Sequence, residues 1–102
     1  MYEILRTDKA DEDLRSIIYF IADDSGSIEV ALNYLDKIEK GIGNLVQFPF
    51  IGVVPIYKTL KVQNYRVLSV EKHLVFYKVN EASKKIIIYR ILSSKQEYLN
   101  LL

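Results

Sequence analysis

Three predicted strands in the second half of the chain each carry polar residues that could bind an anion or transfer a proton. Alternation of period two along NYRVLSV, HLVFYKV and IIIYRIL places Arg66, the pair His73 and Tyr77, and Arg90 on faces that are otherwise mostly apolar. Arginine donates bidentately to phosphate oxygens, and aromatic faces can stack on bases. If the registers bring these residues together, the sheet has a basic, aromatic-edged concavity suited to a phosphodiester.

Each of these residues also has a purely structural interpretation. Arg90 could pair with an acid of the helical hairpin, because a guanidinium is rarely buried without a partner. Arg66 lies beside a predicted turn and could be solvated, and His73, next to Lys72 at a strand start, fits a surface or loop position. Tyr77 could be a core tyrosine with its hydroxyl at the rim. The residues alone leave these alternatives open.

Several other chemistries lack the residues that they need. The chain has one histidine and no cysteine, which argues against a zinc site and excludes a thiolate nucleophile. No Gly-rich phosphate loop and no Ser-His-Asp signature is present in the sequence. We therefore expect no metal and no cofactor.

The elements that must position these residues begin with two helices. Residues 2–6 are predicted to form a short strand, after which Thr7 or Asp8 can cap a helix whose apolar residues recur at i, i+3, i+4, i+7 and i+8. DDSGS, residues 23–27, is predicted as a turn, and Ser27 can cap a second helix that Gly41 and Gly43 weaken near its end. The short connection predicts an antiparallel helical hairpin.

Four extended segments are predicted to follow the helices: residues 53–60, 63–70, 73–79 and 86–92. Residues 80–85 are short enough for a hairpin turn, and the capping box Ser94 to Glu97 predicts a short C-terminal helix. The 102 residues suit one domain, residues 1–102. The order β-α-α-β-β-β predicts an α+β fold in which an antiparallel sheet packs against the N-terminal helical hairpin.

Charge is unevenly distributed along the chain. Residues 1–55 carry five Lys/Arg and ten Asp/Glu, whereas residues 56–102 carry nine and three, so the halves have net charges of −5 and +6. This asymmetry suggests an anionic partner for the second half, although scatter over a solvated surface is the alternative. The N-terminus does not have the pattern of a signal peptide, and no apolar run is long enough to span a membrane, so we expect a cytoplasmic protein without membrane contact.

A set of short motifs, in this order and spacing, resembles the RelE/ParE toxin superfamily of bacterial type II toxin–antitoxin systems. The first helix carries A-x-x-D-L-x-x-I-x-x-[YF]-I from Ala10 to Ile21, and the second leads to L-x-x-F-P, from Leu45 to Pro49. The strands carry Y-R-x-L-x-V, L-V-F-Y-x-V and I-x-R-I-L. Many members have a histidine after the last I-L pair, where this chain has Ser93.

The resemblance implies a toxin bound by an acidic or amphipathic segment of a cognate antitoxin, with one of two activities. RelE-like members cut mRNA on the ribosome without metal, and ParE-like members poison DNA gyrase without being nucleases. Metal-independent RNA cleavage, in which the ribose 2′-OH attacks the adjacent phosphate, is the leading expectation, and gyrase inhibition is the alternative. An inactive member of the superfamily is a third interpretation.

An endoribonuclease of this kind needs cations for the charge on phosphorus and a proton donor for the leaving 5′-oxygen. The resemblance favours a phosphate-binding Arg90 at the end of the last strand over an internal ion pair. The candidate catalytic residues are Arg66, Arg90, Lys95, Tyr98 and Tyr77. The candidate RNA-binding residues are Lys58, Lys61 and His73. Each of these lysines could equally be an ordinary surface residue, and Tyr98 could merely pack the terminal helix.

Overall fold

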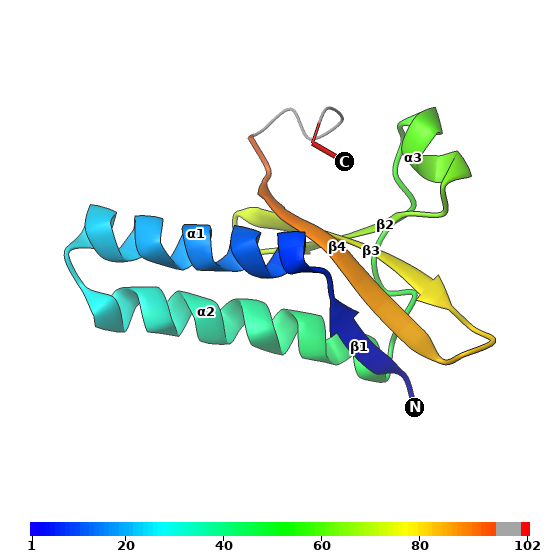
Figure 1. Cartoon of the computed structure of the whole chain (residues 1–102), viewed down its shortest axis with the longest axis horizontal. Coiled ribbons are helices and arrows are strands. Elements are labelled where there is room, and N and C mark those ends of the chain that lie inside the picture. The colour runs from blue at the N-terminus through cyan, green and yellow to red at the C-terminus, as the bar shows by residue number, and fades with distance from the viewer. Residues whose placement is uncertain (96–100) are drawn as a thin grey trace.

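A computed structural model describes residues 1–95 and 101–102 of the chain. The elements are β1 (Glu3–Arg6), α1 (Asp8–Ser25), α2 (Ile28–Gly43), the 3-10 turn η1 (Asn44–Val46), α3 (Lys58–Val62), β2 (Arg66–Val70), β3 (His73–Asn80) and β4 (Lys85–Ser93). The hairpin of α1 and α2 lies along the sheet and projects beyond it at the connection between the two helices (Figure 1). This is the predicted α+β fold. Of the described helices, none is long and apolar enough to cross a membrane.

The sheet is mixed and has the strand order β1-β4-β3-β2. β2, β3 and β4 are antiparallel neighbours, whereas β1 pairs with β4 in parallel, from Glu3 opposite Lys85 to Arg6 opposite Ile88. The expectation of a wholly antiparallel sheet is therefore wrong for β1. A tight turn forces two strands to be antiparallel, but the long connection from β1 to β4 imposes no such constraint.

Both long helices begin at the caps that the sequence predicts, but α1 continues through residues 23–25 of the predicted turn. Thr7 Oγ1 accepts a hydrogen bond from the Ala10 amide at 3.1 Å, and Ser27 Oγ accepts one from the Val30 amide at 3.2 Å. Gly26 ends α1 in the left-handed region at φ 69°, which glycine adopts without a steric penalty. These caps supply partners for helix-end amides and fix the turn between α1 and α2.

The main core lies between this hairpin and one face of the sheet. Leu14 of α1 and Ile38 of α2 pack with side chains of β3 and β4, and Ile38, Ile86 and Ile88 are fully buried. Full burial of one such side chain contributes roughly 1.5–3 kcal/mol. This core fixes the position of β3 and β4, which carry the candidate residues His73, Tyr77 and Arg90.

A smaller buried cluster lies on the opposite face of the sheet and corrects one predicted element. Leu60 of α3 joins Tyr65, Phe76 and Leu92 there. The predicted extended segment 53–60 is wrong beyond its start: Val53 forms an isolated bridge to Val67, and Lys58–Val62 is helical. Pro55 cannot donate to a ladder, and burial of Leu60 favours the helical turn that brings it under the sheet.

Candidate functional site

Arg90 forms an internal ion pair. Its Nε lies 2.7 Å from Asp13 Oδ2 and its Nη2 lies 2.9 Å from Asp13 Oδ1, and both side chains are only 12% exposed. The Ile91 amide also donates to Asp13, at 3.0 Å, and Arg90 Nη1 donates to the carbonyl of Leu101. The hydrogen bond to Asp13 raises the pKa of Arg90. The preference for a phosphate-binding Arg90 over an ion pair is therefore wrong for the structure as it stands.

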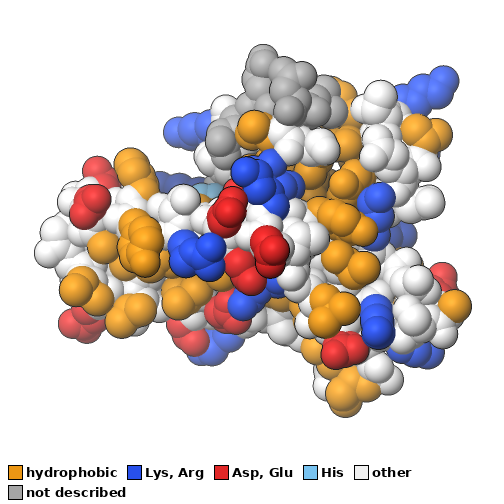
Figure 2. Space-filling view, viewed as in Figure 1, with side chains coloured by type: hydrophobic (Ala, Val, Ile, Leu, Met, Phe, Trp, Pro, Cys, Tyr) orange, Lys and Arg blue, Asp and Glu red, His pale blue; other side chains and the backbone are white. Residues whose placement is uncertain are grey.

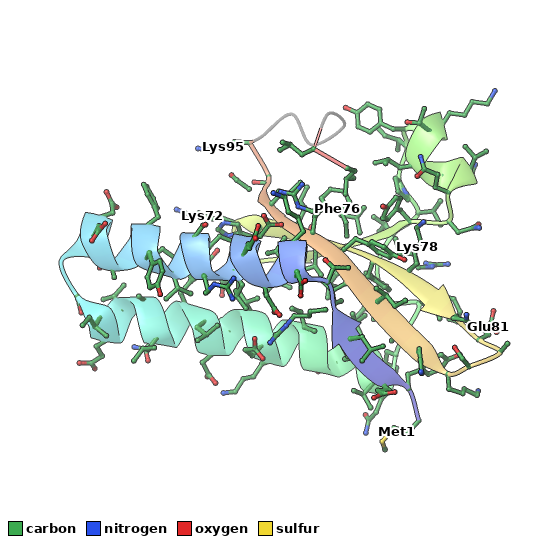
Figure 3. The ribbon with its side chains drawn as sticks, viewed as in Figure 1. Met1, Lys72, Phe76, Lys78, Glu81 and Lys95 are labelled. Atoms are coloured by element: carbon green, nitrogen blue, oxygen red, sulfur yellow. The ribbon has the colours of Figure 1, made fainter. Side chains whose placement is uncertain are left out.

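A groove of about 770 Å³ opens beside this ion pair, between α1 and the ends of β3 and β4. His73 and Lys95 line it together with Arg90, so three of the candidate residues share one site. Phe20 contributes an apolar wall from α1. Figure 3 shows Lys72 and Lys95 on the hairpin side of Phe76, with Lys78 beyond Phe76 on the other side. Among the described residues, no group of three or more His, Asp or Glu could hold a metal ion.

His73 is held by a tyrosine that the strand pattern could not reveal. The hydroxyl of Tyr34, on α2, lies 2.7 Å from His73 Nδ1 and accepts from the Lys72 amide at 3.2 Å. When a neutral His73 carries its proton on Nε2, Nδ1 accepts from the Tyr34 hydroxyl, and in the other tautomer Nδ1 donates to that hydroxyl. Burial lowers the pKa of His73. His73 is half-buried in the groove, and the interpretation as a loop residue is wrong because it is the first residue of β3.

Tyr77 is a core residue. It is fully buried, its hydroxyl donates to the Pro49 carbonyl at 2.8 Å, and it accepts from the Gly52 amide at 3.0 Å. Burial raises the pKa of Tyr77, against smaller opposing effects of the Gly52 amide and the Arg66 charge. The hydroxyl is deeper than the predicted rim position, and both of its hydrogen-bonding directions are used inside the protein.

Arg66 is hydrogen-bonded to the loop of residues 49–52, which also binds the Tyr77 hydroxyl. It does not line the groove beside Arg90. Its Nη1 donates to the carbonyls of Gly52 at 2.7 Å and Phe50 at 3.2 Å, and its guanidinium lies 4.9 Å from the centre of the Phe50 ring. Arg66 lines a separate groove of about 340 Å³ with Lys61, and Lys58 lines a third with Lys61. The predicted site is therefore divided into two regions, and Tyr98 lies outside the described residues.

Lys78 is a further cation that the sequence interpretation missed. Its Nζ lies 4.5 Å from the centre of the Tyr65 ring and 5.1 Å from that of Tyr89. It is placed on the face of the smaller cluster by the same alternation that sends Tyr77 into the main core. Period-two alternation along HLVFYKV therefore predicts that Lys78 lies on the face of the sheet opposite Tyr77.

Comparison with solved structures places this fold among toxins of toxin–antitoxin systems. The chain is similar to a chain of the chromosomal ParDE system of P. aeruginosa, with 25% identity and a TM-score of 0.74 over 91% of this chain and 96% of that one. It shares 16% identity with a chain of the Mycobacterium tuberculosis RelBE2 toxin–antitoxin complex, with a TM-score of 0.64 over 90% and 96% of the two chains. A YoeB/ParE toxin from Agrobacterium tumefaciens also shares 16% identity, with a TM-score of 0.60 over 91% and 98%.

A family model narrows this class. The model described as ParE toxin of type II toxin-antitoxin system, parDE, matches residues 4–98. The chain therefore belongs to the ParE toxin family, within the RelE/ParE superfamily of type II toxins. No curated protein sequence matches it significantly.

Proposed function

We propose that this chain is a ParE-like toxin that inhibits DNA gyrase by binding it, without cleaving RNA. Membership of the ParE family and the 25% identity to a chain of a ParDE system support this proposal. The structures of toxin–antitoxin systems among its neighbours support a cognate antitoxin as its natural inhibitor. Its place of action would be the cytoplasm, where gyrase and the antitoxin are found.

The proposal rests on the contacts of three strand residues that were expected to act on RNA. Arg90 is paired with Asp13, Arg66 donates to loop carbonyls, and the Tyr77 hydroxyl is buried between two backbone groups. A nuclease needs cations free to meet the charge on phosphorus and an acid within reach of the leaving oxygen. These three side chains serve packing and loop geometry instead, which favours a protein-binding activity.

A second candidate function is metal-independent cleavage of mRNA on the ribosome, and one observation favours it. His73, Lys95 and Arg90 line the same groove, and His73 is the one side chain of the chain whose ordinary pKa lies near neutrality. With Nδ1 engaged by Tyr34, its Nε2 would be the nitrogen left for RNA, and Lys95 would stabilise the phosphate. This candidate makes the chain an endoribonuclease with an RNA-binding groove.

Inducible expression in bacteria separates the two functions. We expect incorporation of labelled thymidine to stop before incorporation of labelled leucine, and primer extension on cellular mRNA to show no new ends. Tyr98→Phe keeps the ring, so under gyrase inhibition it should stay toxic. Under RNA cleavage with Tyr98 as the general acid, the same change should slow cleavage by about 10²–10⁴. Early loss of translation with new mRNA ends would refute the gyrase proposal and support the nuclease.

A further inference from the structure

The middle of the chain is free of acidic residues. Between residues 41 and 70 there is no Asp or Glu, whereas Lys58, Lys61 and Arg66 all lie in this stretch. Neither Lys58 nor Lys61 forms an ion pair with any residue in the part of the chain that the structure describes. Positive charge is therefore concentrated here without a compensating partner.

The same stretch exposes an unusual amount of apolar surface. Half of the sixteen exposed large hydrophobic side chains among the described residues fall between Phe48 and Val62, with Ile56 90% and Val62 70% exposed. Scattered exposed hydrophobic residues are normal, but a contiguous apolar patch with polar residues around it is typical of an interaction site. Figure 2 shows orange and blue side chains close together in the region of α3.

Two grooves make this surface continuous. Ile56, Val62 and Lys58 line one groove of about 580 Å³, and Phe50 and Val54 line the smaller one with Arg66. Lys61 lines both, so the two grooves adjoin there. Glu81, from the turn after β3, lines the smaller groove and is an acidic residue beside this surface. We call the residues of these grooves between Phe50 and Arg66 the apolar–basic surface.

We propose that the apolar–basic surface is the docking site for a segment of the cognate antitoxin that carries acidic residues beside apolar ones, and that this site is separate from the groove of Arg90 and His73. Charge complementarity selects the occupant: Lys58, Lys61 and Arg66 outnumber the one acidic residue beside this surface, Glu81, and attract carboxylates, while the apolar side chains gain from burial. Neutralisation and toxicity would then depend on different residues. The inference rests on membership of the toxin family and does not depend on gyrase being the target.

Binding of the purified cognate antitoxin tests this directly. Two double variants remove the two properties in turn: Ile56→Ser with Val62→Ser removes apolar surface, and Lys58→Glu with Lys61→Glu reverses the charge. All four side chains are exposed, so we expect circular dichroism spectra like that of the wild type. Each double variant should bind at least about tenfold more weakly, as expected when central contacts of an interface are lost.

Matched controls lie on other parts of the molecule. Ile28→Ser with Leu32→Ser removes two exposed apolar side chains from α2, which are 72% and 53% exposed, and should change the affinity by less than about twofold. Lys40→Glu with Lys85→Glu reverses two other exposed lysines and should do as little. Between about 0.05 M and 0.5 M salt, the wild type should lose affinity more steeply than the Lys58→Glu, Lys61→Glu variant, because screening weakens exposed charge attraction.

The outcomes decide the proposal in either direction. Wild-type affinity in both test variants, or equal losses in test and control variants, would overturn it. If the apolar double variant does not fold, the charge-reversed variant alone decides. In cells, the Ile56→Ser, Val62→Ser variant should remain toxic and escape neutralisation by the antitoxin. Because the binding measurement contains no gyrase, a protein that fails to inhibit gyrase would refute the proposed function and leave this inference standing.

Discussion

At the scale of single residues, the Asp13–Arg90 pair shows how one side chain can be diverted from an expected role. Asp13 accepts from the guanidinium and from the Ile91 amide, so one carboxylate joins α1 to the end of β4. The charge of Asp13 could be predicted to help the start of α1, but its partner lies 77 residues away in the sequence. The pair stabilises the wall of the groove in which His73 lies.

Arg90→Ala tests whether the pair is structural. The change leaves a largely buried carboxylate without its cation, so we expect the free energy of unfolding to fall by about 3–5 kcal/mol. Glu39→Gln is the control, because it removes only an exposed partner of Arg6, 2.7 Å away, and should cost less than about 1 kcal/mol. Urea denaturation measures both values. A fully stable Arg90→Ala protein that loses toxicity would instead favour a functional arginine.

His73 should make stability depend on pH. Burial lowers the pKa of His73 in the folded protein, so the unfolded chain binds its proton more tightly. The neutral imidazole therefore contributes stability above the unfolded pKa of about 6.5, and that contribution is lost as the pH falls through 6.5 toward the lower folded value. Lys72, Lys95 and Arg90 line the same groove and oppose protonation, whereas Asp13 and Asp24 favour it.

Unfolding free energies of the wild type and of His73→Gln between about pH 5 and pH 7.5 test this sign. The wild type should lose more stability than the variant on acidification, and the difference isolates His73 from the carboxylates that both proteins share. Parallel pH profiles would contradict a histidine held neutral by burial.

At the scale of elements, features set by neighbouring residues could be predicted from the sequence. Features set by contacts between residues distant in the chain could not. Thr7 and Ser27 cap the helices because their side chains bond amides three residues away, which sequence alone reveals. The parallel pairing of β1 and the short helix α3 depend on neighbours that are distant in the chain. The candidate site was divided for the same reason, since the partners of Arg66 and Tyr77 are backbone groups of the loop from Pro49 to Gly52.

Gly41 illustrates a close approach between elements. The sequence predicts that it weakens the end of α2, yet the helix continues to Gly43. A Cβ at position 41 would lie 2.7 Å and 2.9 Å from the two methyl carbons of Val70, so β2 packs directly on this glycine. Gly41 therefore permits contact between α2 and the edge of the sheet.

Gly41→Ala and Gly43→Ala should have opposite effects on stability. The first overpacks the contact with Val70 and should cost about 1–3 kcal/mol, more than the helix propensity of alanine returns. The second meets no atom within 4 Å and has helical backbone angles, so it should stabilise the protein by about 0.5–1 kcal/mol. Thermal unfolding of the two variants measures these effects, and equal shifts in Tm would contradict the packing of Val70 on Gly41.

At the scale of the whole molecule, the two halves differ in charge and in the surfaces that they expose. The acidic half forms the helical hairpin, and the acid-free stretch provides the apolar–basic surface around α3. The cations expected to form one RNA-binding face are distributed over separate grooves. This distribution suits a toxin that binds proteins with more than one surface, which agrees with the gyrase proposal.

The most direct measurement uses purified components. DNA gyrase with relaxed plasmid and ATP is titrated with this chain, and a defined mRNA on programmed ribosomes is incubated with the same preparation. We expect inhibition of supercoiling that the cognate antitoxin reverses, and intact mRNA at every toxin concentration. Unimpaired supercoiling together with antitoxin-sensitive cleavage of the mRNA would contradict the gyrase proposal.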